Sequence, residues 1–240
     1  MAKLQDIPEI ILLCMEETFI TAFNEALPTQ WPSFAENPKI KVTVLNLGLH
    51  AVPVTTKFQL VVSPANSYGR LDGAFDDAIS RKFCLPHHPY DTLTRAAQQV
   101  LYEKWRGFAP PGTCTLVPFP KDMEDTNPWG CKWVALCPTM RAPENVEWDR
   151  EVVYRCVWSL LCQVEGWNHG RSEDRIDSIL MTPLATGIGR VSPQRWASQL
   201  ILAMKHFVDA LERPERWSQL GWGEIEADVL EVEETWKEQL

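Results

Sequence analysis

The chain has 240 residues, of which 45% are hydrophobic and 23% charged, a composition typical of an ordinary globular protein with one sizeable core. Its formal net charge is −9, so it lacks the long-range attraction that basic proteins have for nucleic acids and anionic membranes. We therefore expect neither a nucleic acid nor a membrane as a partner. A small anionic ligand stays compatible with this charge, because the charge of one pocket is independent of the net charge.

The seven cysteines are odd in number, and no two of them have the C-x-x-C spacing. This indicates free thiols in a reducing compartment, the cytosol or the nucleus. Cys14, Cys137 and Cys162 lie inside apolar runs and are expected to be buried. We expect no metal site and no cofactor. Residues 1–10 lack a basic start followed by a long apolar run, so no secretory signal is expected, and the longest apolar runs are strand-sized.

Apolar runs bounded by breakers alternate along the chain with segments of helical periodicity. The runs predict strands at 9–15, 40–47, 58–62, 112–119, 132–137 and 176–181. Apolar residues at helical spacing predict helices at 17–27, 73–83, 91–107, 147–166 and 192–211. Asp91 and Ser192 are the expected N-caps of two helices, and residues 28–39 and 121–130 are expected as loops. This alternation predicts a mostly parallel sheet with helices on both faces.

The composition changes near residue 213. From there onward the chain has three basic and eight acidic residues, which amounts to −5 of the net charge, and it includes Trp217, Trp222 and Trp236. We therefore expect a domain at 1–212 and an acidic C-terminal appendage at 213–240. The appendage can be interpreted in two ways: its tryptophans dock on the body of the domain, or it forms an acidic helix that binds a protein partner.

One strand-to-helix junction, at residues 61–79 (VVSPANSYGRLDGAFDDAI), has an unusual composition. Its small residues allow the backbone to approach a ligand closely, and the start of the following helix offers unpaired N–H groups to an anion. Asn66 places an amide at the end of the strand. Asp76 lies in the first helical turn, where its charge is favourable to the helix dipole.

A second junction, at residues 181–193 (MTPLATGIGRVSP), also joins an apolar strand to a helix. The backbone N–H groups from Thr186 to Gly189 can surround a phosphate, and Arg190 adds a positive charge. Each junction alone has an ordinary alternative, since glycine turns and asparagines after strands are common turn elements. Together the two junctions suit a diphosphate held at the carboxyl ends of central strands.

The residues of both junctions resemble the ligand loops of macro domains. VVSPANSYGRLDGAFD is similar to the first loop in the branch that reads S-P-A-N-S-F-G-x-M-D-G-G-x-D, and PLATGIGR resembles the second, diphosphate-binding loop. PTMRAP at 138–143 resembles the A-P-T-M-R-x-P segment of the same branch. The three matches occur in the family's order, fit roughly residues 9–211, and point most closely to the fungal macro-like proteins.

The resemblance implies a three-layer α/β/α macro-domain fold with a mixed, mostly parallel central sheet at residues 1–212. It also implies a pocket for ADP-ribose or an ADP-ribosylated protein. Asn66 would contact the distal ribose, and Asp76 would position or activate a water molecule, so these two are the implied catalytic residues. The implied ligand contacts are Asn66, Ser67, Gly73, Ala74, Phe75, Asp76, Ala185, Thr186, Gly187, Ile188, Gly189 and Arg190.

The chain departs from the family at three places. Ala74 stands where the family has glycine, Ser63 replaces the first asparagine of the common N-A-A-N motif, and residues 47–57 contain no acid to bind adenine. Backbone groups or Glu16 are the alternatives for adenine. Three functions therefore stay open: hydrolysis of ADP-ribosyl esters or ADP-ribose 1″-phosphate, non-catalytic reading of ADP-ribose, and a degenerate fold whose acidic appendage recruits a protein.

Three further residues have two interpretations each. His87 and His88 lie between prolines, where a surface turn is expected and a position at the border of the pocket is the alternative. Arg141 is either a structural residue in an ion pair or a contact of the ligand.

Overall fold

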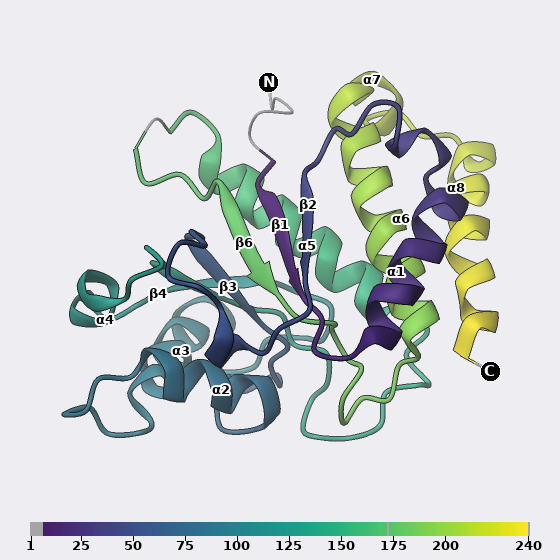
Figure 1. Ribbon diagram of the computed structural model, residues 1–240. Coiled ribbons are helices and arrows are strands. Elements are labelled where there is room, and N and C mark those ends of the chain that lie inside the picture. The colour runs from purple at the N-terminus through teal and green to yellow at the C-terminus, as the bar shows by residue number, and fades with distance from the viewer. Residues whose placement is uncertain (1–6, 172, 240) are drawn as a thin grey trace.

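The structure is a computed structural model that describes residues 7–171 and 173–239 (Figure 1). Its sheet has the strand order β2-β1-β6-β3-β5-β4, in which only β4 runs antiparallel to its neighbour. The strands are β1 Glu9–Leu13, β2 Val42–Leu45, β3 Leu60–Ser63, β4 Thr115–Pro118, β5 Trp133–Leu136 and β6 Ser178–Met181. The predicted mixed, mostly parallel sheet is confirmed. The expectation of no secretory signal falls largely on residues 1–6, which lie outside the described residues.

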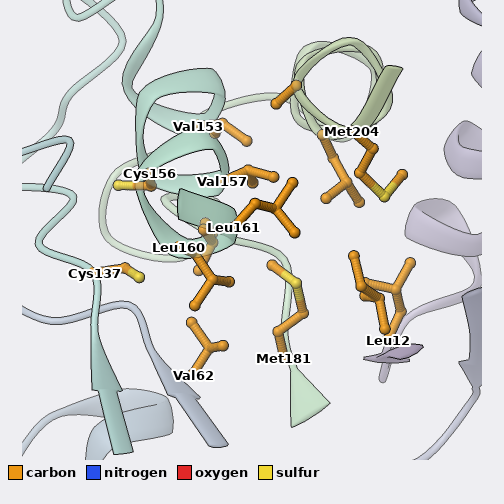
Figure 2. Close-up of a cluster of buried hydrophobic side chains, with 14 of the residues drawn as sticks. Leu12, Val62, Cys137, Val153, Cys156, Val157, Leu160, Leu161, Met181 and Met204 are labelled. Atoms are coloured by element: carbon orange, nitrogen blue, oxygen red, sulfur yellow. The ribbon is translucent and has the colours of Figure 1, made fainter. Parts of the chain in front are cut away.

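Helices cover both faces of the sheet (Figure 1). The helices are α1 Glu17–Gln30, α2 Ala74–Phe83, α3 Thr92–Trp105, α4 Lys121–Thr126, α5 Val152–Asn168, α6 Pro193–Glu212, α7 Pro214–Trp217 and α8 Trp222–Glu234. Alternate side chains of each strand point to opposite faces, so that Leu12 packs toward α5 and α6 whereas Leu13 packs toward α2 and α3. Figure 2 shows Leu12, Val62 and Met181 of three neighbouring strands facing α5 and α6. The predicted three-layer α/β/α arrangement is confirmed.

The chain differs from the sequence prediction at three helices. Residues 121–126 form the short helix α4 instead of a loop, because the fully buried Met123 anchors this otherwise polar segment. Helix α1 continues through Pro28 to Gln30, since a proline in the last turn removes only one helical hydrogen bond. Helix α5 begins at Val152 rather than 147, because the Arg195 guanidinium takes the carbonyl oxygens of residues 147 and 149.

All seven cysteines are free thiols. Cys14 and Cys137 are buried as predicted, but Cys162 is exposed, so the prediction for this residue was wrong. Cys162 lies six positions after the buried Cys156 of the same helix. Six steps of 100° turn a side chain to another face of the helix, and an apolar run alone did not reveal this.

The capping predictions had mixed outcomes. The Ser192 hydroxyl accepts the N–H of Arg195 (3.1 Å), as an N-cap does. Asp91 also stands at an N-cap position, but its carboxylate accepts from Arg95 (2.8 Å) and makes no capping bond. None of the described helices is long and apolar enough to cross a membrane.

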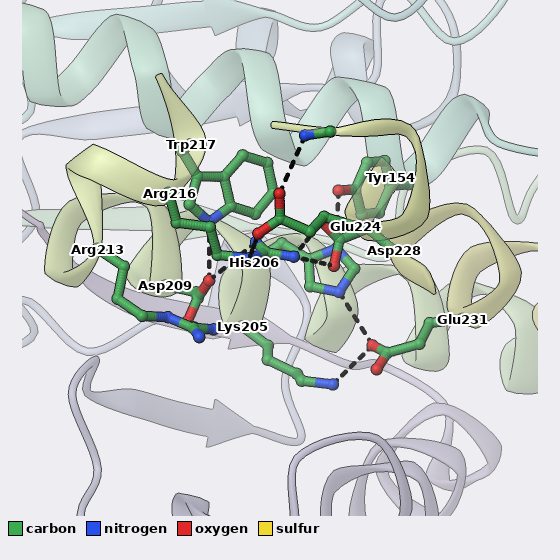
Figure 3. Close-up of polar contacts among 11 residues, drawn as sticks. Tyr154, Lys205, His206, Asp209, Arg213, Arg216, Trp217, Glu224, Asp228 and Glu231 are labelled. Atoms are coloured by element: carbon green, nitrogen blue, oxygen red, sulfur yellow. Dashed lines mark hydrogen bonds and ion pairs between the residues drawn. The ribbon is translucent and has the colours of Figure 1, made fainter. Parts of the chain in front are cut away.

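The acidic segment from residue 213 lies against α6 as helices α7 and α8, followed by a short 3-10 helix at Thr235–Gln239, the C-terminal turn. Figure 3 shows His206 of α6 between the Tyr154 hydroxyl (2.9 Å) and the Glu231 carboxylate (3.0 Å). Trp217 packs on Trp158, with ring centroids 5.4 Å apart. The segment is therefore docked on the body, although Trp222 is 78% exposed.

Candidate functional site

A cavity of about 240 Å³ lies at the carboxyl ends of four adjacent parallel strands, β1, β6, β3 and β5. Each strand is followed by a segment that lines it. Loop one (residues 64–73) joins β3 to α2, and loop two (residues 182–192) joins β6 to α6. Because β3 pairs directly with β6, the two loops begin side by side. This edge of an open parallel sheet is where α/β proteins bind their ligands.

Ten of the twelve ligand contacts implied by the sequence line this cavity: Asn66, Gly73, Ala74, Phe75, Asp76, Ala185, Thr186, Gly187, Ile188 and Gly189. Ser67 does not line it. Its N–H and hydroxyl both donate to the Met140 carbonyl, which ties loop one to the segment after β5. Arg190 also lies outside the lining, on the exposed side of loop two.

The Asn66 side chain organises loop one. Its amide oxygen accepts the N–H groups of Tyr68 (3.1 Å) and Arg70 (3.3 Å), and its amide nitrogen donates to the Arg70 carbonyl (2.9 Å). These are the bonds of an ordinary turn-forming asparagine. They use one of the two amide N–H bonds, and the second is left to reach a ligand. Asn66 is thus a structural residue of the loop as well as a residue lining the cavity.

Asp76 combines burial with a place on the cavity wall. It is 6% exposed, and its Oδ1 accepts the Ser63 hydroxyl at 2.6 Å. Burial raises the pKa of Asp76 to about 7, the Ser63 hydrogen bond opposes this rise, and the nearby Asp72 adds to it. The serine that replaces the family's first asparagine is therefore a direct partner of the carboxyl group. At neutral pH this carboxyl is poised between its two protonation states.

Three residues at the two strand-to-helix junctions have positive φ although they carry a side chain. They are Ala74 (49°), Ala185 (62°) and Arg190 (58°). A left-handed conformation costs a residue with a Cβ roughly 1–2 kcal/mol relative to glycine. Such strained residues persist where the surrounding structure over-determines them, and they cluster at ligand sites. The family's glycine at position 74 would adopt this conformation without strain.

Replacing Ala74 by glycine is therefore expected to raise the free energy of unfolding by about 0.5–1 kcal/mol, the relief of strain less the entropy of the more flexible unfolded chain. Urea unfolding measures the change. The control is Ala78→Gly in the same helix, in ordinary helical conformation, which should lower stability by about 1 kcal/mol. A loss of stability in both variants would contradict the strain at Ala74.

Loop two is held together by close backbone packing. A Cβ added at Gly189 would lie 2.4 Å from the Ala185 carbonyl oxygen and 2.9 Å from Val146. The Gly189 carbonyl accepts the Val146 N–H (3.0 Å). At Gly187 a Cβ would meet no atom within 4 Å. One glycine of the Gly-x-Gly turn is therefore required by the fold, whereas the other faces open space beside the cavity.

Part of the lining escaped the sequence prediction. Phe19 and Met15 line the cavity from the β1–α1 junction, together with Glu16, which the sequence analysis named only for adenine. An ordinary strand-to-helix transition gave no signal for the first two. Thr139, Met140 and Pro143 come from the PTMRAP segment, from which the sequence analysis had named only Arg141, a residue that does not line the cavity. Also lining the cavity are Pro64, Arg70, Asp72, Thr182 and Pro183.

His87 and His88 form a surface turn and do not line the cavity. Within the described residues, they and Asp122 are the one group close enough to hold a metal ion. The Leu85 N–H donates to His88 Nδ1 (3.4 Å), and His88 Nε2 lies 2.7 Å from the Asp122 carboxylate. These contacts tie the turn to the start of α4.

Arg141 contacts aromatic residues beside the cavity. Its Nε donates to the Tyr68 hydroxyl (3.2 Å), and its guanidinium lies 5.4 Å from the centroid of the Phe108 ring. It does not line the cavity, although its neighbour Met140 does. These contacts describe a residue that supports loop one from outside.

No protein-family model and no curated protein matches the chain. Solved structures similar to it include a mutant of the Oceanobacillus iheyensis macrodomain, at 15% identity over 66% of this chain and 70% of that chain, with a TM-score of 0.46. They also include the Oceanobacillus iheyensis macrodomain with ADP, at 13% identity over 66% of this chain and 90% of that chain, with a TM-score of 0.37. Such values describe a partial likeness of fold and do not assign the chain to a family.

Proposed function

We propose that the cavity binds ADP-ribose or an ADP-ribosyl derivative in the manner of a macro domain. One observation carries the proposal: the two segments that resemble the family's ligand loops, far apart in the sequence, follow paired strands and line the same cavity. The Oceanobacillus iheyensis macrodomain with ADP is a neighbour of similar fold. The chemistry that recognises the ligand would come from the residues that line the cavity of this chain.

A diphosphate would be bound by backbone N–H groups. The N–H groups of residues 74 and 75 open α2, where they have no partner within the helix and where the helix dipole favours an anion. Nearby carboxylates are neutralised, since Asp72 pairs with Arg70 and Asp77 with Arg81. Asp76 is held partly protonated near pH 7 by burial, which raises its pKa. The site can thus accept an anion although the protein is acidic.

The rest of the ligand would lie against the apolar part of the lining. Met15, Phe19 and Met140 offer an apolar surface of the kind that holds a nucleobase. Glu16 is an exposed lining carboxylate and supplies the acceptor for the adenine amino group that residues 47–57 lack. Of the two alternatives for adenine, its place in the lining favours Glu16 over backbone groups.

Hydrolysis of an ADP-ribosyl bond is the second candidate function, and Asp76 favours it. A general base works best when its pKa is near the operating pH, and burial raises the pKa of Asp76 to about 7. Asp76 would orient or deprotonate a water molecule, while N–H groups at the start of α2 stabilise the charge that develops. A reader would bind the same ligand without this step.

Titration calorimetry of ADP-ribose tests the binding proposal, with an expected dissociation constant in the micromolar range (about −8 kcal/mol). Gly187→Glu should abolish binding, because it puts bulk and negative charge beside the diphosphate. It should leave the thermal unfolding temperature nearly unchanged, since a Cβ there meets no protein atom within 4 Å and the position is exposed.

The matched control is Gly166→Glu in α5, which also enters open space but lies away from the cavity. It adds the same charge and should bind like the unmodified protein. Folded protein that gives no heat with ADP-ribose would overturn the proposal. Equal binding by both variants would show that ADP-ribose does not use loop two.

A further inference from the structure

The C-terminal turn contacts loop two directly, although about 50 residues separate them in the sequence. The Gln239 amide nitrogen donates to the Arg190 carbonyl (3.0 Å), and its amide oxygen accepts the Ser192 N–H (3.0 Å). The Ser192 hydroxyl donates to the Glu238 carbonyl (2.6 Å). Two residues at the end of loop two are therefore bonded to the last described turn of the chain.

Gln239 has two further partners. Its nitrogen donates to the Glu147 carboxylate (2.9 Å), and its oxygen accepts from the Arg195 guanidinium (3.4 Å). Arg195 is almost fully buried and also donates to the Glu147 carbonyl (3.1 Å). The amide of one side chain thus joins the C-terminal turn, the segment before α5, loop two and the start of α6.

The bonded part of loop two is the part that needs support. Arg190 is in the strained left-handed conformation (φ 58°), and the carbonyls on either side of this strain accept bonds from other segments. On one side the Val146 N–H donates to the Gly189 carbonyl (3.0 Å). On the other side Gln239 holds the next carbonyl, that of Arg190. Residues held against strain require such surrounding contacts.

The C-terminal turn is itself fixed to the body. The buried Thr235 hydroxyl accepts from Gln199 of α6 (3.0 Å). Earlier in the same segment, Arg216 joins Asp228 of α8 (2.9 Å) to Asp209 of α6 (3.3 Å), as Figure 3 shows. A turn anchored in this way can transmit its position to loop two.

We propose that Gln239 is a positioning residue of the ligand site, which holds the backbone of loop two in the conformation that presents its N–H groups to the ligand. The acidic segment 213–239 is then a working part of the site rather than an appendage beside it. The effect on ligand affinity rests on the proposed function. The effect on loop two does not, because it is a property of the ligand-free protein.

The test variant is Gln239→Glu, which has nearly the same shape. It keeps an oxygen to accept from Ser192 and Arg195, but it replaces the donor facing the Arg190 carbonyl and the Glu147 carboxylate with a second negative oxygen. Hydrogen exchange followed by mass spectrometry should show the amides of residues 183–192 exchanging at least about tenfold faster. The affinity for ADP-ribose should fall about tenfold.

Two further variants separate positioning from a general loss of structure. Lys237→Gln, on the exposed side of the same turn, changes the net charge by the same amount and should alter neither measurement. Adding Glu147→Gln to Gln239→Glu reverses the polarity of their hydrogen bond and removes the repulsion. It should restore part of the protection of loop two, which a merely unfolded turn would not regain.

The outcomes distinguish the two proposals. Unchanged exchange in loop two, or a rise confined to residues 213–239, overturns the positioning role. Faster exchange in loop two with an unchanged affinity for ADP-ribose would mean that Gln239 positions the loop but does not serve the ligand site, which overturns the proposal. Faster loop exchange in a protein that never binds ADP-ribose supports the positioning role and contradicts the proposed ligand.

Discussion

Replacing Gly189 by alanine is expected to lower the free energy of unfolding by about 2–3 kcal/mol, the usual cost of forcing an extra methyl group into a packed site. The new Cβ would lie 2.4 Å from the Ala185 carbonyl oxygen, which is itself bonded to the Val191 N–H (3.1 Å). Backbone atoms cannot move aside as the end of a flexible side chain can. The loop must therefore open, and ADP-ribose binding should be lost with it.

The matched substitution is Gly187→Ala, two residues earlier in the same loop. A Cβ there meets no protein atom within 4 Å, so stability should change by less than about 0.5 kcal/mol. Urea unfolding gives the two stabilities, and calorimetry gives the two affinities. If Gly189→Ala were as stable as Gly187→Ala, the close packing of Gly189 against Ala185 would not exist in solution.

Much of the site could be predicted because its chemistry is local in sequence. Loops one and two each follow an apolar strand and open a helix, and their small residues allow close approach to the backbone. Parallel strands bring such loops to one edge of the sheet, so their convergence followed from the fold class. For the same reason the sequence also predicted Ser192 as an N-cap, since its partner Arg195 is only three residues away.

The parts that escaped prediction depend on contacts between distant segments. Phe19 and Met15 line the cavity only because β1 lies beside β6, which the sequence does not reveal. Ser63 was recognised as a departure from the family, but its bond to Asp76 needs the start of α2 to fold back over the end of β3. Gln239 lies in a segment whose acidity suggested an appendage, and polar contacts of a single side chain leave no periodic pattern.

Replacing Asp76 by asparagine is expected to stabilise the protein at pH 8 while reducing any hydrolytic activity at least tenfold. Burial raises the pKa of Asp76 from 3.8 to about 7 in the folded state. Between these two values the folded protein keeps a proton that the unfolded chain has released, so stability falls as the pH rises. The stability contribution is complete below about pH 4 and is lost above about pH 7. Three pKa units correspond to about 4 kcal/mol.

Asparagine has the same shape, stays neutral and can still accept the Ser63 hydroxyl. Urea unfolding should therefore show a gain over the unmodified protein of about 1.6 kcal/mol at pH 5, which is 1.2 units above 3.8, and of about 4 kcal/mol at pH 8. The neighbouring Asp77 is the control, because its hydrogen bond to Arg81 holds its pKa below the usual range. Asp77→Asn should lose stability at pH 8. This change has the opposite sign to the one expected for Asp76→Asn.

The same variant decides whether Asp76 performs chemistry. A general base contributes about a hundredfold or more to a rate, so Asp76→Asn should reduce hydrolysis of an ADP-ribosyl ester or of ADP-ribose 1″-phosphate at least tenfold while ADP-ribose still binds.

A gain in stability together with that loss of hydrolysis would mean that the protein keeps a destabilising buried acid for the reaction it performs. A gain in stability with unchanged binding, and no hydrolysis by either protein, would identify a reader. Equal stability at pH 8 would show that the carboxyl is solvated, and its role as a tuned base would then have to be abandoned.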